Sequence, residues 1–232
     1  MSTSIKEPTE LERIYVNRFG PGELEYRRLI WKALIDGLFQ RMVPESATVL
    51  DLGCGYGEFI NQIACGTRLA MDLNPAAREA LRPDVRLFQQ DCSTKWELPD
   101  DSLDLVFTSN FFEHLPDKQA LKLTLQETLR CLRPGGRLIA VGPNIKCLPG
   151  KYWDFWDHFL PLTERSLAEG LVNQGFEVIR MIDRFLPYTT VGWRQYPAAL
   201  VRLYLHFKPA WRVFGGQFLV VARKPRTPGE SP

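Results

Sequence analysis

Apolar and polar residues alternate along the chain in a pattern that predicts seven short strands separated by helices. The apolar runs that fit strands lie at 48–52, 68–73, 85–90, 103–107, 137–141, 177–182 and 217–222. Apolar residues recur at helical spacing over 23–42, 117–132 and 163–174, and a shorter helix is expected over 74–81. Because strands and helices alternate with short joints, the predicted fold is α/β, with a doubly wound and mostly parallel seven-stranded sheet.

The same pattern divides the chain into a central domain and less regular flanks. Residues 1–9 are polar and are expected to be disordered, as are residues 224–232. Residues 10–43 are expected to form N-terminal helices, interrupted by Gly20-Pro21-Gly22. The domain itself is assigned to 44–223, with an insertion at 184–216 before the last strand.

A glycine-rich turn follows the first strand and marks the predicted ligand site. Gly53, Gly55 and Gly57 stand at alternate positions, where glycine permits a positive φ and a close ligand approach. A helix is expected to begin at this turn, with unpaired N–H groups at its N-terminus. The carboxylate of Asp51, at the end of the strand, would repel a phosphate and attract an ammonium or sulfonium group. The turn therefore favours a ligand with a cationic end.

The glycine spacing distinguishes this turn from a dinucleotide-binding fingerprint. That fingerprint is Gly-x-Gly-x-x-Gly, whereas this chain reads Asp-x-Gly-x-Gly-x-Gly from Asp51 to Gly57. With this motif, and with a Leu-Arg-Pro-Gly-Gly turn before the fifth strand, the chain resembles the class I S-adenosylmethionine (SAM) dependent methyltransferases. The resemblance implies a Rossmann-like sheet whose last strand is antiparallel, and SAM as the cofactor. A chance glycine-rich turn is the alternative.

The resemblance also assigns further residues to the cofactor. Asp72 stands where the family places an acid that accepts both ribose hydroxyls, although Asp72 could instead cap the following helix. Asp91 and the main chain of Cys92 are expected at the adenine, and Asn110 and Phe111 at the methionine end. The expected cofactor-binding residues are Asp51, Gly53, Cys54, Gly55, Gly57, Asp72, Leu73, Asp91, Cys92, Asn110 and Phe111.

Two histidines are candidates for catalysis on the acceptor side. His114 lies in a Glu-His-Leu sequence after the fourth strand, where it either helps to form the substrate pocket or braces the loop. His158 lies in an aromatic stretch, 152–159, which suits either a pocket wall or a surface loop packed on itself. An oxygen nucleophile would need a base, and His158 and His114 are the imidazoles near the expected site.

The expected activity is methyl transfer from SAM to a small-molecule, saccharide or lipid-linked acceptor, on oxygen. Residues 157–166 and 185–190 resemble bacterial methyltransferases associated with the synthesis of glycans or lipid-linked saccharides. The Ser-Asn-Phe-Phe loop after the fourth strand lacks the Asn-Pro-Pro-Tyr or Asp-Pro-Pro-Tyr pattern that is used to methylate amino groups. An RNA or protein methyltransferase is an alternative, as is a non-catalytic SAM-binding module of the same fold.

Composition and charge favour no other class of protein. The net charge of +2 does not by itself indicate a nucleic-acid partner. The five cysteines form no Cys-x-x-Cys pair, so neither a metal site nor a disulfide framework is expected, and a reducing, cytoplasmic setting fits. No uninterrupted apolar run reaches about 18 residues, which argues against a signal peptide or a transmembrane helix.

The insertion at 184–216 has an unusual composition, with five basic residues and no Asp or Glu. Leu200, Leu203, Tyr204 and Phe207 fall on one apolar stripe of a helix. We expect a helical cap over the sheet edge and the substrate mouth. A second hypothesis adds a peripheral contact with an anionic inner-membrane surface. The oligomeric state is left open.

Overall fold

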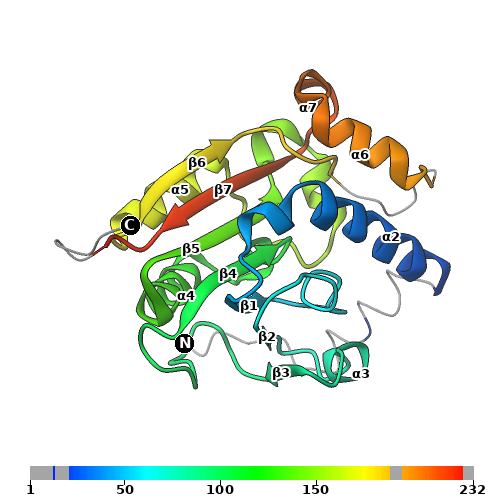
Figure 1. Ribbon diagram of the computed structural model, residues 1–232. Coiled ribbons are helices and arrows are strands. Elements are labelled where there is room, and N and C mark those ends of the chain that lie inside the picture. Colours follow the sequence, from blue (N-terminus) through cyan, green and yellow to red (C-terminus); the bar gives the residue numbers. More distant parts are fainter. Residues whose placement is uncertain (1–12, 14–20, 189–194, 227–232) are drawn as a thin grey trace.

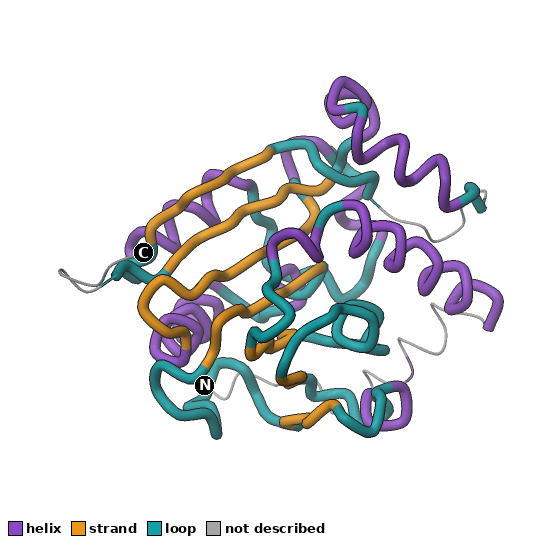
Figure 2. The backbone as a smooth tube through the Cα atoms, viewed as in Figure 1, coloured by secondary structure: helices purple, strands orange, loops and turns teal. Residues whose placement is uncertain are grey.

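The computed structural model describes residue 13 and residues 21–188 and 195–226, and a seven-stranded sheet forms its centre (Figures 1 and 2). The strand order is β3-β2-β1-β4-β5-β7-β6. The strands are β1 (Thr48–Leu52), β2 (Thr67–Met71), β3 (Val85–Phe88), β4 (Leu103–Ser109), β5 (Leu132–Pro143), β6 (Glu177–Ile182) and β7 (Gln217–Arg223).

The pairing of the strands confirms the predicted α/β fold. The strand β1 pairs in parallel with both β2 and β4, and β5 continues the parallel part of the sheet. The last strand, β7, is antiparallel to both of its neighbours, β5 and β6. The chain leaves β1 for β2 on one side and later returns to β4 on the other. The carboxyl ends of β1 and β4 therefore flank a switch point, where such sheets bind ligands.

Helices cover both faces of the sheet. The α-helices are α2 (Pro21–Gly37), α3 (Ala77–Ala80), α4 (Lys118–Cys131), α5 (Glu164–Asn173), α6 (Ala198–His206) and α7 (Lys208–Phe214), and the 3-10 helices are η1 (Phe39–Met42), η2 (Phe112–His114), η3 (Ile145–Cys147) and η4 (Lys151–Asp154). One core cluster joins the sheet to α4 and α5, and a second joins it to α2, α6 and α7. Alternate residues of a strand enter opposite clusters, as Val106 and Phe107 of β4 do.

Two predicted helix starts are confirmed by their capping hydrogen bonds. The side chain of Asp117 accepts a hydrogen bond from the main-chain N–H of Ala120 over 2.8 Å, at the start of α4. At the start of α5, Thr163 and Ser166 form a capping box in which each side chain accepts from the other's main-chain N–H. Both helix starts are encoded locally.

The prediction of a helix directly after the glycine turn is wrong. Residues 53–62 form a series of turns, with i to i+4 hydrogen bonds from Asn61 to Gly57 and from Ile63 to Phe59. The side chain of Asn61 donates to the main-chain oxygen of Ala80 and accepts from the N–H of Arg82. Because Asn61 ties this segment to the end of α3, tertiary contacts replace a regular helix.

Other element boundaries also differ from the prediction. The α-helix α3 is limited to four residues and β3 ends at Phe88. The Leu-Arg-Pro-Gly-Gly segment belongs to β5 rather than to a separate turn. Gly135 donates its main-chain N–H to Lys224, and Lys224 donates its own to Gly136. The chain is therefore hydrogen-bonded through residue 224, one residue past the predicted end of the domain.

Some predictions fall outside the described residues. These are the disordered segment 1–9, most of the helix at 10–19, residues 189–194 of the insertion and the final residues 227–232. In the part of the chain that the structure describes, no helix has both the length and the apolar character needed to cross a membrane.

The described part of the insertion forms a helical pair, α6 and α7, and α6 lies alongside α2 (Figure 1). Leu205 of α6 comes so close to α2 that a Cβ at Gly37 would lie 2.9 Å from it. The hydroxyl of Tyr204 donates to the main-chain oxygen of Phe185, and the indole of Trp211 donates to that of Tyr204. The predicted apolar stripe is thereby divided, because Tyr204 packs inward whereas Leu203 is exposed.

Candidate active site

A cavity of about 660 Å³ lies at the carboxyl ends of β1 and β4. Its walls come from the glycine turn, the loop after β4, the aromatic stretch, α2, α6 and α7. It brings together seven of the predicted site residues: Asp51, Gly53, Cys54, Gly55, Asn110, His114 and His158. The other six are outside its lining: Gly57, Asp72, Leu73, Asp91, Cys92 and Phe111. The volume is in the range of small-molecule sites.

The glycine turn is held against the end of β2. The main-chain N–H groups of Gly53 and Cys54 both donate to the carbonyl oxygen of Met71. Gly53 has a φ of +71°, and a Cβ there would lie 2.2 Å from the ring of Phe111. Only glycine therefore fits at this position, and Phe111 lies directly against the turn. Gly57 faces Leu81 instead, so its predicted role at the cofactor stays a prediction.

Asp51 is a buried acid in an acidic environment at the cavity wall. Its side chain is 4% exposed, and burial, followed by the nearby charge of Glu58, raises its pKa well above the usual range. Asp72 adds a smaller effect in the same direction. Glu58 itself forms an ion pair with Arg27 of α2 at 2.7 Å. A cationic ligand would relieve this concentration of negative charge.

Asp51→Asn is expected to weaken SAM binding about tenfold. Loss of a contact with a charged group costs roughly 1.5 kcal/mol of binding free energy, which corresponds to that change in affinity. Because its pKa is raised, Asp51 takes up a proton at a higher pH than an ordinary Asp. Protonation removes the charge that attracts a cation, so the wild-type affinity should decrease as the pH falls through the raised pKa. Calorimetric titrations of both proteins across the acidic range test this.

The ligand-free protein provides a control for this variant. A carboxyl whose pKa is raised by folding stabilises the folded state below its unfolded pKa, and this stabilisation is lost as the pH rises through the folded value. At neutral pH, Asp51→Asn should therefore unfold no earlier than the wild type in thermal melts. Identical pH profiles of SAM affinity in the two proteins would exclude Asp51 from the contact.

Asp72 is fixed by main-chain N–H groups on both sides. Its two carboxylate oxygens accept from Gly55 and Asn74, each over 2.8 Å. Burial raises its pKa, and these hydrogen bonds partly oppose the rise. Asp72 does not cap α3, since Asn74 provides the side-chain oxygen that accepts from Ala76. Asp72 is thus rigidly placed beside the glycine turn, and its role at the ribose stays a prediction.

The predicted adenine side is formed by Asp91 and Cys92. Asp91 accepts hydrogen bonds from both the main-chain N–H and the hydroxyl of Ser93, each over 2.8 Å. The Cys92 side chain is buried in the core, and burial raises the pKa of its thiol to about 12. Thr124 donates to its sulfur. The thiol is therefore a neutral packing group, which leaves the main chain as the part of Cys92 that could meet a ligand.

The loop after β4 begins with a left-handed residue, Asn110, whose φ is +50°. The main-chain N–H of Asn110 donates to Val141 of β5, and its side-chain amide donates to the hydroxyl of Ser109. These contacts fix the loop at the sheet edge. They place Asn110 in the cavity wall and turn Phe111 towards the glycine turn.

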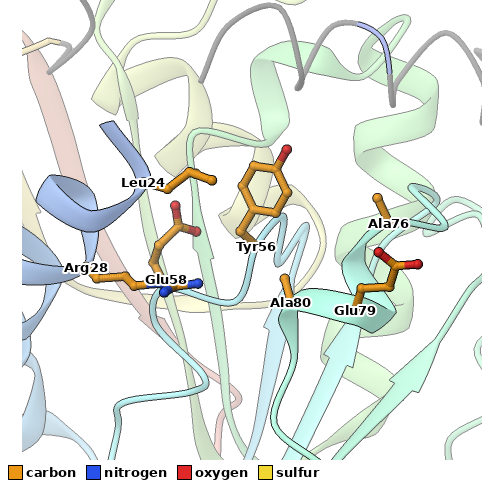
Figure 3. Close-up of a pocket in the computed structure, with 7 residues that line it drawn as sticks. All are labelled: Leu24, Arg28, Tyr56, Glu58, Ala76, Glu79 and Ala80. Carbon is orange, nitrogen blue, oxygen red and sulfur yellow. The ribbon is translucent and has the colours of Figure 1, made fainter. Parts of the chain in front are cut away.

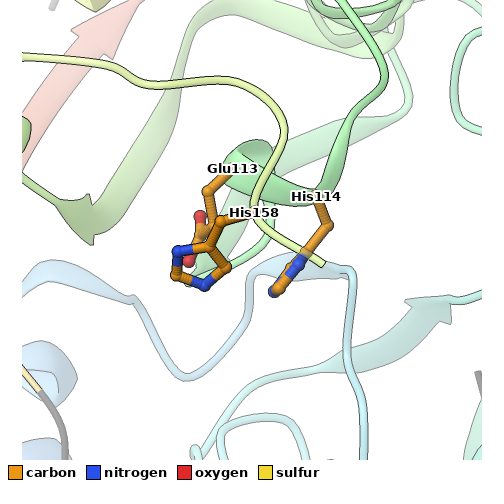
Figure 4. Close-up of side chains that lie close together, drawn as sticks. All are labelled: Glu113, His114 and His158. Carbon is orange, nitrogen blue, oxygen red and sulfur yellow. The ribbon is translucent and has the colours of Figure 1, made fainter. Parts of the chain in front are cut away.

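Glu113, His114 and His158 lie close together in the lining of the cavity (Figure 4). One side-chain donor or acceptor atom of each lies within 4.8 Å of those of the other two. The main-chain oxygen of Glu113 accepts from Phe159 and Leu160, which draws the aromatic stretch onto the loop after β4. Three side chains from two distant segments are thereby brought together.

The two histidines have different surroundings. His114 Nδ1 lies 2.8 Å from the main-chain oxygen of Asp157 and 3.2 Å from its carboxylate, so His114 ties the two loops together. His158 is 8% exposed and stacks on Phe155, with ring centroids 5.0 Å apart. The geometry of His114 fits the bracing alternative, and that of His158 fits a pocket wall.

Two features of the cavity were not predicted from the sequence. The first is Glu113, which directly precedes the candidate His114. The Glu-His-Leu sequence could have indicated that Glu113 also lies at the site. The ion pair between Arg27 and Glu58 joins α2 to the glycine turn. Arg27 interrupts the row of apolar residues on that helix, which could have indicated an ion pair.

A second cavity, of about 350 Å³, opens beside the glycine turn (Figure 3). Tyr56 stands in its centre, between residues of α2 and residues at α3. Glu58 lines this cavity as well as the larger one. The glycine turn and the residues directly after it therefore contribute to two cavities. The larger is the predicted acceptor site, and the smaller lies beside α3.

Comparison with known proteins agrees with this arrangement. A seven-stranded sheet of this order, with a glycine turn at its switch point, is the fold of a class I SAM-dependent methyltransferase domain. Residues 24–181 match the family described as "Methyltransferase domain", so the chain belongs to this methyltransferase family.

Two curated relatives illustrate the range of the family. The 2-methyl-6-phytyl-1,4-hydroquinone methyltransferase of Synechocystis sp. is 29% identical over 57% of this chain and 47% of its own length. The trans-aconitate 2-methyltransferase of Azoarcus sp. is 35% identical over 49% of this chain and 46% of its own length. The chain thus spans about half the length of these relatives.

Solved structures share the fold over most of the chain. A structure from the complex between the Haloferax volcanii Trm112 methyltransferase activator and a methyltransferase covers 96% of this chain and 100% of its own, with a TM-score of 0.68 and 20% identity. A SAM-dependent methyltransferase from Archaeoglobus fulgidus covers 85% of this chain and 94% of its own, with a TM-score of 0.62 and 20% identity.

The family implies SAM as the cofactor, and residues of this chain fit it. The buried carboxylate of Asp51 suits a cationic end, and Asp72, held beside the glycine turn, offers two acceptor oxygens of the kind that a diol needs. The glycine at position 53 is required by the ring of Phe111, which occupies the space of a Cβ there, so Gly53 gives no separate support for the cofactor. The individual contacts stay predictions.

Proposed function

We propose that this protein methylates a hydroxyl oxygen of a small-molecule acceptor. The observation that carries the proposal is the cluster of Glu113, His114 and His158, which shares one cavity with Asp51 and the glycine turn. Bound SAM would supply an activated methyl group on its sulfonium. The protein then has two tasks, to align the acceptor oxygen and to remove its proton.

Each part of the cavity has a role in this proposal. Asp51 attracts the cationic end of the cofactor, and the glycine turn lets the cofactor lie against the backbone. One ring nitrogen of His158 takes the proton from the acceptor hydroxyl, while His114 holds the loop that carries His158 in place. The rings of Phe155 and Tyr188, which also line the cavity, keep water away from the reacting oxygen.

The relatives support a small-molecule acceptor. The names of the two described above specify a phytyl-substituted hydroquinone and trans-aconitate, which are both small molecules. A saccharide or lipid-linked acceptor agrees with the resemblance of residues 157–166 and 185–190 to enzymes of glycan synthesis. Methylation of RNA or protein is the competing activity, and SAM binding without transfer is the non-catalytic alternative.

The assay for this proposal uses methyl-labelled SAM and cell extract separated into water-soluble small molecules, lipids, nucleic acid and protein. Label should appear in a small-molecule or lipid fraction with the wild type. His206→Ala, which changes an exposed histidine outside the cavity, should give the same result. Label confined to nucleic acid or protein would contradict the proposal.

We also propose that the insertion makes a peripheral contact with an anionic membrane surface. Lys208 and Arg212 are exposed on α7, and each basic residue near such a surface adds about 1 kcal/mol to binding. Lys208→Glu/Arg212→Glu should reduce flotation with anionic vesicles, and salt should release the wild type. Lys118→Glu/Lys122→Glu on α4 is the matched control. Equal flotation with anionic and neutral vesicles would leave the insertion as a lid only.

A further inference from the structure

The wall of the large cavity continues onto the outer surface of α6 and α7. Four apolar side chains line the cavity and are also largely exposed: Leu200 (45%), Leu203 (63%), Phe207 (58%) and Phe214 (61%). We call these four residues the apolar rim. The cavity is therefore bordered on this side by apolar side chains that are exposed to solvent.

Packing among the residues that the structure describes does not account for the rim. The neighbouring face of α6 packs into the core, where Leu205 meets α2 and Val201 and Tyr204 pack against the same cluster. On α7 the buried Trp211 belongs to that cluster. The rim residues lie beside these contacts and remain exposed. A contiguous exposed apolar surface at the mouth of a cavity is typical of a binding site.

The cavity lining contains both buried polar residues and exposed apolar ones. Glu113 and His158 are buried, whereas the rim residues are exposed. An acceptor that contacts both needs a polar reacting head and an apolar chain. Lys208 and Arg212 of α7 are exposed, as is Arg202 of α6, which pairs with Asp36 of α2 over 3.8 Å, and the chain has no Asp or Glu from 184 to 216.

We infer that the acceptor is an amphiphile, whose head enters the cavity and whose apolar chain lies along the rim. The basic residues around the rim suit an anionic bilayer as the source from which this acceptor is taken. The inference rests on the proposed function and specifies its substrate class. Lys and Arg beside apolar side chains are the arrangement of a surface that meets lipid headgroups and acyl chains together.

The test measures binding of hexyl, octyl and decyl β-D-glucopyranosides by calorimetry, below their micelle concentrations. In the wild type the affinity should rise about twofold with each methylene added to the alkyl chain. A methylene half covered by the rim gains about half the transfer free energy of a fully buried methylene. Leu203→Ser/Phe207→Ser should remove this chain-length dependence. Val172→Ser/Ile179→Ser changes two exposed apolar residues on α5 and β6 and should preserve it.

SAM binding provides the check on folding, since Leu203 and Phe207 are exposed side chains that do not belong to the glycine turn or to its contacts with Met71. The rim variant should bind SAM with unchanged affinity. Equal affinities for the hexyl and decyl glycosides, or the same chain-length dependence in the rim variant, would overturn the inference. A wild-type dimer that the rim variant dissociates, without chain-length dependence, would assign the rim to a second copy of this chain.

The methyl-transfer assay separates the inference from the proposed function. Label in a water-soluble acceptor, at a rate that the rim variant does not change, would overturn the amphiphile and leave the proposed function intact. Chain-length dependence without transfer of label to any fraction would overturn the proposed function and leave a lipid-binding site. Label in a lipid acceptor, lost in the rim variant and kept in the control variant, supports both.

Discussion

His158→Ala is expected to lower turnover about a hundredfold while SAM affinity stays nearly unchanged. Loss of a general base typically removes two or more orders of magnitude from the chemical step. His158 lines the cavity beside Glu113, and in the proposed function it meets the acceptor rather than the cofactor. Single-turnover kinetics with SAM in excess would measure the chemical step, and calorimetry would measure SAM affinity.

The controls for this prediction separate a chemical role from a structural one. His158 packs on Phe155 and Tyr152, so the variant His158→Gln retains bulk without a titrating ring. It should melt close to the wild type and be as slow as the alanine variant. The wild-type rate should rise with pH along the ionisation of an imidazole, and this dependence should be absent in His158→Gln. Wild-type turnover in both variants would assign the proton to another acceptor.

Asp72→Ala is expected to weaken SAM and its demethylated product equally, by about ten- to a hundredfold. The lost contacts are hydrogen bonds from two ribose hydroxyls to a charged acceptor, worth roughly 1.5–3 kcal/mol. Both ligands have the same ribose, so the effect should not depend on the methyl group. Calorimetric titration of both ligands into wild type and variant measures it directly.

Asp72 also holds the glycine turn, and a second variant separates this role from ribose binding. Asp72→Asn keeps a side-chain oxygen that can accept from the main-chain N–H of Gly55 or Asn74, but loses the negative charge. It should melt between the wild type and Asp72→Ala, because one of the two main-chain N–H groups then faces the amide NH2 instead of an oxygen, and it should still bind both ligands more weakly. Unchanged affinities in Asp72→Ala would remove Asp72 from the ribose site.

Local signals in the sequence were enough to predict much of the fold. Asp117 and Thr163 were predicted as helix caps because capping depends on residues within one turn. Period-two and period-3.6 patterns located the strands and the longer helices. The antiparallel position of β7 came from the family resemblance, because strand order depends on contacts between distant segments.

The errors have a common physical cause, which is competition from tertiary contacts. Residues 53–62 form turns rather than a helix because Asn61 bonds to the end of α3. The stripe on α6 divides because Tyr204 packs against the core and bonds to Phe185, whereas Leu203 is left to solvent. Periodicity identifies apolar residues on a helix, but it does not say which neighbour will cover them.

The acceptor end of the site shows the same limit. His114 and His158 were candidates because of their residue type and the segments in which they lie. Their proximity depends on Glu113, whose main-chain oxygen binds two N–H groups of the aromatic stretch, 46 and 47 residues further along the chain. A contact over that separation leaves no pattern in a single sequence, so the full cluster became visible only in the fold.

Transfer of a carbon-13 methyl group from labelled SAM, followed by NMR of the isolated product, tests the central claim most directly. The account predicts a methyl carbon bonded to oxygen in a small-molecule or lipid product, formed by the wild type and by His206→Ala but about a hundredfold more slowly by His158→Ala. A methyl carbon bonded to nitrogen or carbon, label found only in nucleic acid or protein, or no labelled product from any extract would contradict it.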